Sequence, residues 1–165
     1  MAKSQMDELT EETLGKGGIL ARLYFDMESE KAEDLQPIMT DLINNRLLKA
    51  AGVVYCYGTI NEPMKLEKSY QTSAIVTALF KDVGSIMNVA FNFVPAGLEI
   101  IKPDRDIKMK PNELQAILLD LAQISINYSQ YILSRVLSKE DYEKVMKDMK
   151  NREELGKKII GKKEG

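Results

Sequence analysis

The sequence predicts a mixed α+β domain in which the elements follow the order strand, helix, strand, strand, helix, strand, with two more helices at the C-terminal end. Between residues 19 and 101, segments with apolar residues at every second position alternate with segments whose apolar residues recur every three or four positions. Proline and glycine mark the boundaries of these segments. The 165 residues, of which 44% are hydrophobic, are enough for one domain with a sizeable core.

Four segments have the composition and alternation of β-strands. The first, residues 19–27, places Ile19, Ala21, Leu23 and Phe25 on one face and Arg22 and Tyr24 on the other. The second, residues 53–60, is rich in β-branched and aromatic residues. We expect a long third strand over residues 66–80 and a short fourth one over residues 98–101.

Two helices separate these strands. The first is expected over residues 34–51, with a buried stripe made of Leu35, Met39, Leu42, Ile43 and Ala50. The second follows Asp82, which is placed to cap it. The element order of residues 19–101 is that of the split βαβ, or ferredoxin-like, motif. Its helices cover one face of the sheet, so the other face must be solvated, covered by another element or used in association.

Two segments flank this core. Residues 1–18 predict a short helix, capped by Ser4 and Asp7, and a linker rich in glycine. The glycines around Lys16 come before a strand, whereas a phosphate-binding loop follows one, so a linker is expected. Beyond the core we expect a long helix over residues 111–136, a last helix from Ser138 to Leu155, and a basic flexible tail over residues 156–165. Residues 19–155 are then one domain.

Composition narrows the function more by exclusion than by any motif. The chain has no histidine, which excludes Ser-His and Cys-His nucleophiles and histidine-bound metals. The net charge of −2 gives no global attraction to nucleic acid or to a membrane. One cysteine, Cys56, allows no internal disulfide, and no apolar run is long enough to span a membrane. We therefore expect a cytoplasmic protein with no cofactor and no metal.

The open face of the predicted sheet is the first candidate site. One register of the second strand places Tyr55 and Tyr57 beside Arg22 and Tyr24, which gives four candidate ligand-binding residues. Tyrosines with an arginine can stack on a small molecule or on nucleic-acid bases. The third strand lacks the signature of RNA-recognition domains, and nucleic acid is the less favoured partner. The alternative is that the long helix or a second subunit covers this face.

The long helix is the second candidate, as an interface. Residues at alternating spacings of three and four form a mostly apolar seam that begins at Leu114 and ends at Arg135. The candidate interface residues in this seam are Ile117, Leu121, Ile124, Tyr128 and Tyr131. A helix of this length, about 39 Å at 1.5 Å per residue, is longer than the sheet is wide. The seam packs either on the chain's own sheet or last helix, or on a second subunit.

Three smaller features have structural explanations that we favour. We expect Asp104-Arg105-Asp106 to be a solvated loop, Asp82 to Ser85 to be a helix cap, and Cys56 to be a core residue. The leading hypothesis is a non-enzymatic, homo-oligomeric binding or regulatory domain. The alternatives are a small enzyme that uses carboxylates, lysine or a divalent metal, and a weak RNA-binding module.

Overall fold

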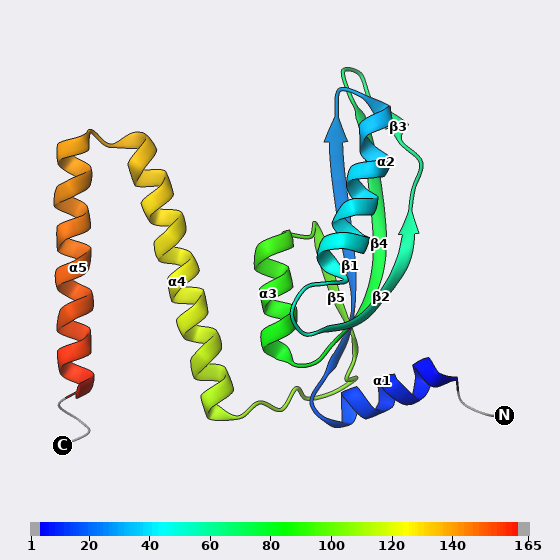
Figure 1. Ribbon diagram of the computed structural model, residues 1–165, viewed down its shortest axis with the longest axis horizontal. Coiled ribbons are helices and arrows are strands. Elements are labelled where there is room, and N and C mark those ends of the chain that lie inside the picture. Colours follow the sequence, from blue (N-terminus) through cyan, green and yellow to red (C-terminus); the bar gives the residue numbers. More distant parts are fainter. Residues whose placement is uncertain (1–3, 162–165) are drawn as a thin grey trace. The chain divides into compact units, whose positions relative to one another are not determined.

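The computed structural model describes residues 4–161, and within that range all side chains except those of residues 153 and 156–161. The chain divides into two compact units (Figure 1). The first unit ends at Leu114 and contains the sheet with its helices; the second begins at Gln115 and contains the rest of a long helix and the last helix. The predicted α+β class is confirmed.

The sheet contains four main strands and one short one. Strands β1 (Ile19–Ser29), β2 (Val53–Ile60), β4 (Tyr70–Phe80) and β5 (Gly97–Lys102) lie in the order β2-β4-β1-β5, and all neighbours are antiparallel. The two-residue strand β3 (Met64–Lys65) pairs with the start of β4. The third strand was predicted to begin at Leu66. That boundary is wrong, because residues 66–69 form a turn in which the Leu66 N–H donates to the Ser69 carbonyl oxygen.

Helices lie on one face of this sheet, as the alternation in β1 predicts. Helices α2 (Ala32–Asp41) and α3 (Val83–Phe93), with the π-helical segment η1 (Leu42–Leu47), pack against that face (Figure 1). The core between them is formed by Ile19, Ala21, Leu23 and Phe25 of β1, Ala74, Val76, Ala78 and Phe80 of β4, and Met39, Ile43, Leu47, Ile86 and Val89 of the helices.

The helix predicted over residues 34–51 is not one regular α-helix. Its second half, η1, has wider turns, in which the N–H of Leu48 donates to the carbonyl oxygen five residues earlier, at Ile43. The wider turns change which residues face the core, and Leu47, which the predicted stripe omitted, is fully buried. Arg46, which lies at helical spacing from Leu42 and Ile43 of that stripe, is exposed, and its guanidinium lies 5.8 Å from the ring centre of Phe93.

Helix α1 (Gln5–Gly15) begins with the predicted capping box and ends in a tight turn. Ser4 and Asp7 each accept a hydrogen bond from the other's backbone N–H. At the other end, Gly18 N–H donates to Thr13 O and Gly17 N–H donates to Leu14 O, which is a Schellman motif. Gly17 has φ of 99°, a conformation that favours glycine. The glycines therefore end a helix in an ordered turn.

The second unit is helical. Helix α4 (Pro111–Val136) has the predicted bounds, and its residues from Gln115 onward belong to this unit. Ser138 caps helix α5 (Lys139–Gly161) by accepting a hydrogen bond from the Asp141 N–H. Helix α5 continues past the predicted end at Leu155, and residues 162–165 of the predicted tail lie outside the described part of the chain. None of the described helices is long and apolar enough to cross a membrane.

Candidate functional site

The sheet face opposite α2 and α3 carries all four side chains that the sequence singled out. The strand register aligns Tyr57, Thr77, Arg22 and Glu99 in one row across β2, β4, β1 and β5. The next row in one direction contains Ile75 and Tyr24, and the next in the other contains Tyr55, Leu79 and Leu20. Directly opposed residues in antiparallel strands point to the same side of a sheet, so these side chains share one face.

A polar cluster occupies the β1 and β5 side of this face. Arg22 Nη1 lies 3.1 Å from Glu99 Oε2, and the Tyr24 hydroxyl donates to the same oxygen at 3.3 Å. Hydrogen bonding and electrostatic interaction with Tyr24, and then the negative charge of Glu99, raise the pKa of Arg22 above its ordinary value. The guanidinium is therefore a permanent positive charge, held in place by two neighbours.

The backbone of β5 leaves room for one of these rings. A Cβ atom at Gly97 would lie 3.2 Å from Cδ2 of Tyr24. Since contacts this short are rare, the absence of a side chain at Gly97 lets the Tyr24 ring lie close to the edge strand. Glycine thus determines where that ring sits on the face.

The tyrosines of β2 are placed differently from each other. Their rings stack with centroids 6.1 Å apart and planes inclined by 27°. The Tyr55 hydroxyl shares a hydrogen bond of 2.8 Å with Thr10 of α1, and Leu79, opposite Tyr55, is fully buried although it faces away from α2 and α3. We infer that α1 covers this end of the face. Tyr57 is 55% exposed and is the more available of the two for a ligand.

Sequence reasoning missed two partners on this face, Glu99 and Thr10. Glu99 is the only charged residue within the predicted fourth strand. An isolated charge in a strand can indicate a site residue, so the sequence did contain a hint of Glu99. Its pairing with Arg22 depends on a strand order that the alternation pattern does not give. The role of Thr10 could not be predicted, because nothing in the sequence indicates that the first helix packs on the sheet.

The predicted interface residues of α4 are mostly exposed. Ile117 is buried and Ile124 is half-buried. Leu121, Tyr128 and Tyr131 are 39%, 58% and 61% exposed. Arg135 lies with its guanidinium 5.2 Å from the ring centre of Tyr131, which continues the seam to the last turn of the helix. Leu114, where the seam begins, is also exposed, and exposed apolar residues flank the seam as well: Leu118, Ile132 and Val136.

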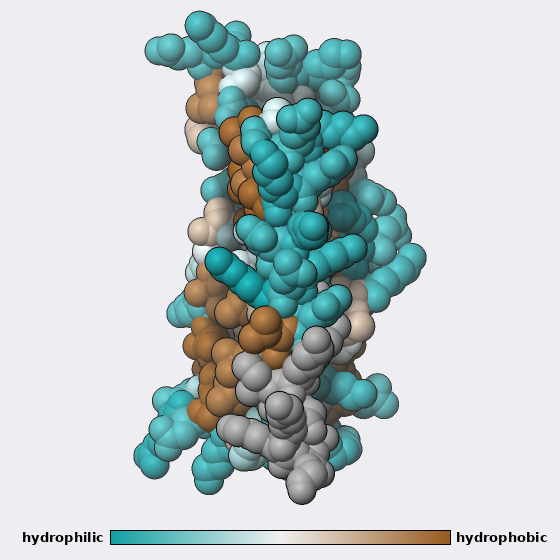
Figure 2. Space-filling model, turned by 90° about the vertical axis from the view of Figure 1, so that its left-hand side faces the viewer, coloured by the Kyte–Doolittle hydropathy of each residue, from teal (hydrophilic) through white to brown (hydrophobic). Residues whose placement is uncertain are grey.

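Exposed apolar surface of this extent is unusual for a soluble domain. Figure 2 shows hydrophobic residues gathered in a band beside a surface that is otherwise hydrophilic. The hydrophilic part agrees with the composition of α5, where charged residues prevail, and the large exposed apolar residues of the second unit are mostly those of α4.

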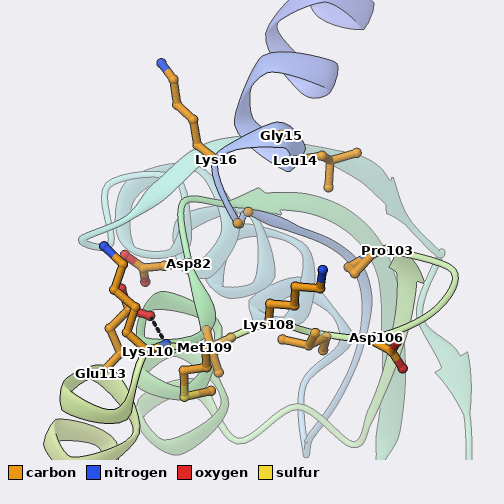
Figure 3. A pocket seen from close by; sticks show the side chains of 14 residues that line it. Leu14, Gly15, Lys16, Asp82, Pro103, Asp106, Lys108, Met109, Lys110 and Glu113 are labelled. Carbon is orange, nitrogen blue, oxygen red and sulfur yellow. Dashed lines mark hydrogen bonds between the residues drawn. The ribbon is translucent and has the colours of Figure 1, made fainter.

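We call the sheet face with Arg22, Tyr24, Tyr55 and Tyr57 the tyrosine face. A separate cleft of about 480 Å³ lies in the first unit, and none of these four residues lines it. The α1 turn at Gly15 to Gly18, the start of α3 and the segment from Pro103 to Glu113 line it (Figure 3). In Figure 3, Lys108 and Lys110 extend from this segment. Two of its acids are engaged in helix capping: Asp82 accepts from Ser85 N–H at 2.8 Å, and Glu113 accepts from Lys110 N–H at 3.0 Å.

Two other charged residues near this end, Lys16 and Asp104, form ion pairs. Lys16 points away from the cleft in Figure 3 and forms an ion pair of 2.6 Å with Glu12, and this contact lowers the pKa of the Glu12 carboxyl. Asp104 pairs with Lys102. Within residues 4–161 there is no group of three or more His, Cys, Asp or Glu residues that could hold a metal ion.

A comparison with protein-family models finds a match to the MJ0538 family over residues 20–156. This range includes all of the sheet except Ile19, both helices that cover it, all of α4 and most of α5. No curated protein and no solved structure matches the chain.

Proposed function

The chain belongs to the MJ0538 family, and we propose that it acts as a non-enzymatic, homo-oligomeric binding or regulatory domain with a ferredoxin-like fold in the cytoplasm. Support for the fold comes from the strand order β2-β4-β1-β5 with antiparallel neighbours and from two helices on one sheet face. A single unpaired cysteine is compatible with a reducing compartment.

The observation that carries the oligomer is the exposed seam of α4. Removing apolar surface from water is favourable by about 25 cal/mol for each Å² buried. Exposed Leu and Tyr side chains therefore favour association with another surface. Tyr128 and Tyr131 are both more than half exposed, and tyrosine is enriched at the centres of protein interfaces. Symmetric pairing of two copies is the most common way to bury such a surface.

Light scattering coupled to size-exclusion chromatography tests this proposal at micromolar concentration. We expect a mass of at least two chains for the wild type and a lower mass for Tyr128→Asp, which places a charge in the seam. Gln123→Asp is the matched control, because it adds the same charge to an exposed position on another side of the same helix. A wild-type mass of one chain would remove the oligomer from the proposal.

The tyrosine face is the proposed ligand site, with Arg22, Tyr24, Tyr55 and Tyr57 as contacts. The exposed Tyr57 ring offers a stacking surface, and the fixed charge of Arg22 lies in the same row. A flat, anionic small molecule matches this pair best. A fragment screen by NMR should shift resonances of β1 and β2 in the wild type and not in Tyr57→Ala. Shifts confined to the cleft around Lys108 would instead favour the enzyme alternative.

The RNA alternative makes a separate prediction. Binding through Arg22 and the lysines would release counterions, so the affinity for single-stranded RNA should fall steeply between 50 and 200 mM salt, as is general for phosphate contacts. Absence of binding at low salt would exclude it, and the small-molecule proposal would remain.

A further inference from the structure

We propose that two copies of the chain pair through α4 in antiparallel orientation, so that the Arg135 end of one helix lies against the Glu113 and Asp120 half of the other. This inference rests on the proposed self-association and adds the orientation of the two helices. The partner of the seam is then the α4 helix of a second copy of the chain.

The charges of α4 carry the argument. Among its 26 residues, only Glu113, Asp120 and Arg135 are charged. The two acids lie in the first half of the helix and the arginine lies in the last turn. In a parallel, in-register pair, each Arg135 would face the Arg135 of its partner. In an antiparallel pair, each arginine approaches the partner's acids, and both ends of the interface gain an attraction of opposite charges.

The positions of these charges relative to the seam agree with this orientation. Glu113 and Asp120 are seven residues apart, so they lie on the same flank of the helix, next to Leu114 and Leu121 of the seam. Arg135 is itself a seam position and stacks on Tyr131. Flanking charges of coiled coils determine which partner orientation is stable.

The shapes of the seam residues agree as well. The first half of the seam is aliphatic, with Leu114, Ile117 and Leu121, and the second half is aromatic, with Tyr128 and Tyr131. Antiparallel pairing packs the small half of one helix against the large half of the other, and this keeps the distance between the helix axes nearly constant. Parallel pairing would place four tyrosines and two arginines in one half of the interface.

The seam is also on the free side of the helix near its C-terminal end. There the half-buried residues are Gln130 and Leu133. At 100° per residue these two lie on a different side of α4 from the exposed Tyr128. Near this end, the seam is therefore the face available to a second copy, whereas Ile117 in the first half of the seam is buried.

The charge-reversal variant Arg135→Glu separates the two orientations by the size of its effect on the dimer dissociation constant. In an antiparallel pair it places like charges together at both ends, so the dimer dissociation constant at low salt should rise by about fivefold or more. In a parallel, in-register pair it would replace a repulsion between two arginines by one between two glutamates, and the constant would change little. Adding Asp120→Arg to Arg135→Glu should return the constant toward the wild-type value only in the antiparallel case.

Distance measurement gives an independent answer. A spin label at Ser134→Cys in a Cys56→Ala background would lie near one end of α4. From a rise of 1.5 Å per residue, the two labels of an antiparallel dimer should be about 30 Å or more apart. Labels within about 15 Å, as in side-by-side parallel helices about 10 Å apart, would overturn the orientation and leave the proposed oligomer intact. A monomeric protein would overturn both.

Discussion

Arg22 and Glu99 lie directly opposite each other on β1 and β5, with the Nη1 atom of one 3.1 Å from the Oε2 atom of the other. The two residues are 77 positions apart in sequence. Both side chains are about half-exposed, so solvent and salt screen their attraction. The pair therefore serves mainly to orient the guanidinium and the Tyr24 hydroxyl on the tyrosine face.

The first prediction concerns this orientation. Glu99→Gln keeps an oxygen that can accept from Tyr24 but removes the negative charge. We expect a small loss of thermal stability at low salt that disappears in 1 M NaCl, because salt already screens the pair. Differential scanning calorimetry measures the thermal stability at both salt concentrations. Glu62→Gln, at an exposed position of the turn after β2, is the control and should show no such salt dependence. A loss that persists in high salt would mean that Glu99 has a packing role.

The second prediction concerns the contact between β2 and β4. A Cβ atom at Gly58 would lie 2.1 Å from the Ile75 carbonyl oxygen and 2.8 Å from the Val76 Cα atom. Both are backbone atoms of β4, so β2 would have to move away from its only main neighbour. Gly58→Ala should therefore destabilise the protein by about 1–3 kcal/mol, as overpacking does.

Urea denaturation measures this effect, and Gly15→Ala is the control. A Cβ atom at Gly15, the last residue of α1, meets nothing within 4 Å. Alanine is also the better helix former, so this variant should be neutral or slightly stabilised. Equal stability of the two variants would show that β2 and β4 are not as close as the structure has them.

The third prediction concerns how α1 is held on the sheet. Tyr55→Phe removes the hydroxyl that bonds to Thr10 and leaves the ring in place. We expect the free energy of unfolding to fall by about 0.5–1.5 kcal/mol. Hydrogen exchange should become faster in α1 and remain unchanged in β4. Tyr57→Phe is the matched control, since no hydrogen bond of its hydroxyl occurs among the described residues. Unchanged exchange in α1 after Tyr55→Phe would contradict the inference that this contact holds the helix.

The strands were predictable because alternation is a local property. Ile19, Leu23 and Phe25 need one buried face, and the register of β1 follows directly from this need. The same argument identified the tyrosine face, since Arg22 and Tyr24 occupy the alternate positions. The short strand β3 could not be predicted, because two residues show no periodicity.

Other features depend on contacts between distant segments. Nothing near Leu47 in the sequence indicates the wider helical turns of η1 that accompany its burial. Likewise, Thr10 meets Tyr55 across 45 positions. The long helix illustrates a different limit: its heptad spacing predicts a seam, but spacing alone does not identify the surface that the seam packs on. The orientation experiment with Arg135 tests whether that surface is the same helix of a second copy.

The last prediction concerns the single thiol. Cys56 pairs with Ala78 on the covered face of the sheet, and burial raises the pKa of its thiol above the ordinary value. The folded protein therefore holds this proton at a pH where the unfolded chain has begun to release it. Stability falls with rising pH wherever the native state binds more protons than the unfolded state, so this thiol should destabilise the fold above about pH 8.5.

Two measurements check this thiol. Reaction with a disulfide reagent at pH 8 should be slower in the native protein than in the urea-unfolded chain, because less thiolate is present and access is lower. The free energy of unfolding of the wild type should also fall more steeply between pH 8 and 10 than that of Cys56→Ala, which has no proton to lose at this site. Parallel pH profiles of the two proteins, or a native thiol that reacts as fast as the unfolded one, would show that the sheet does not shield Cys56.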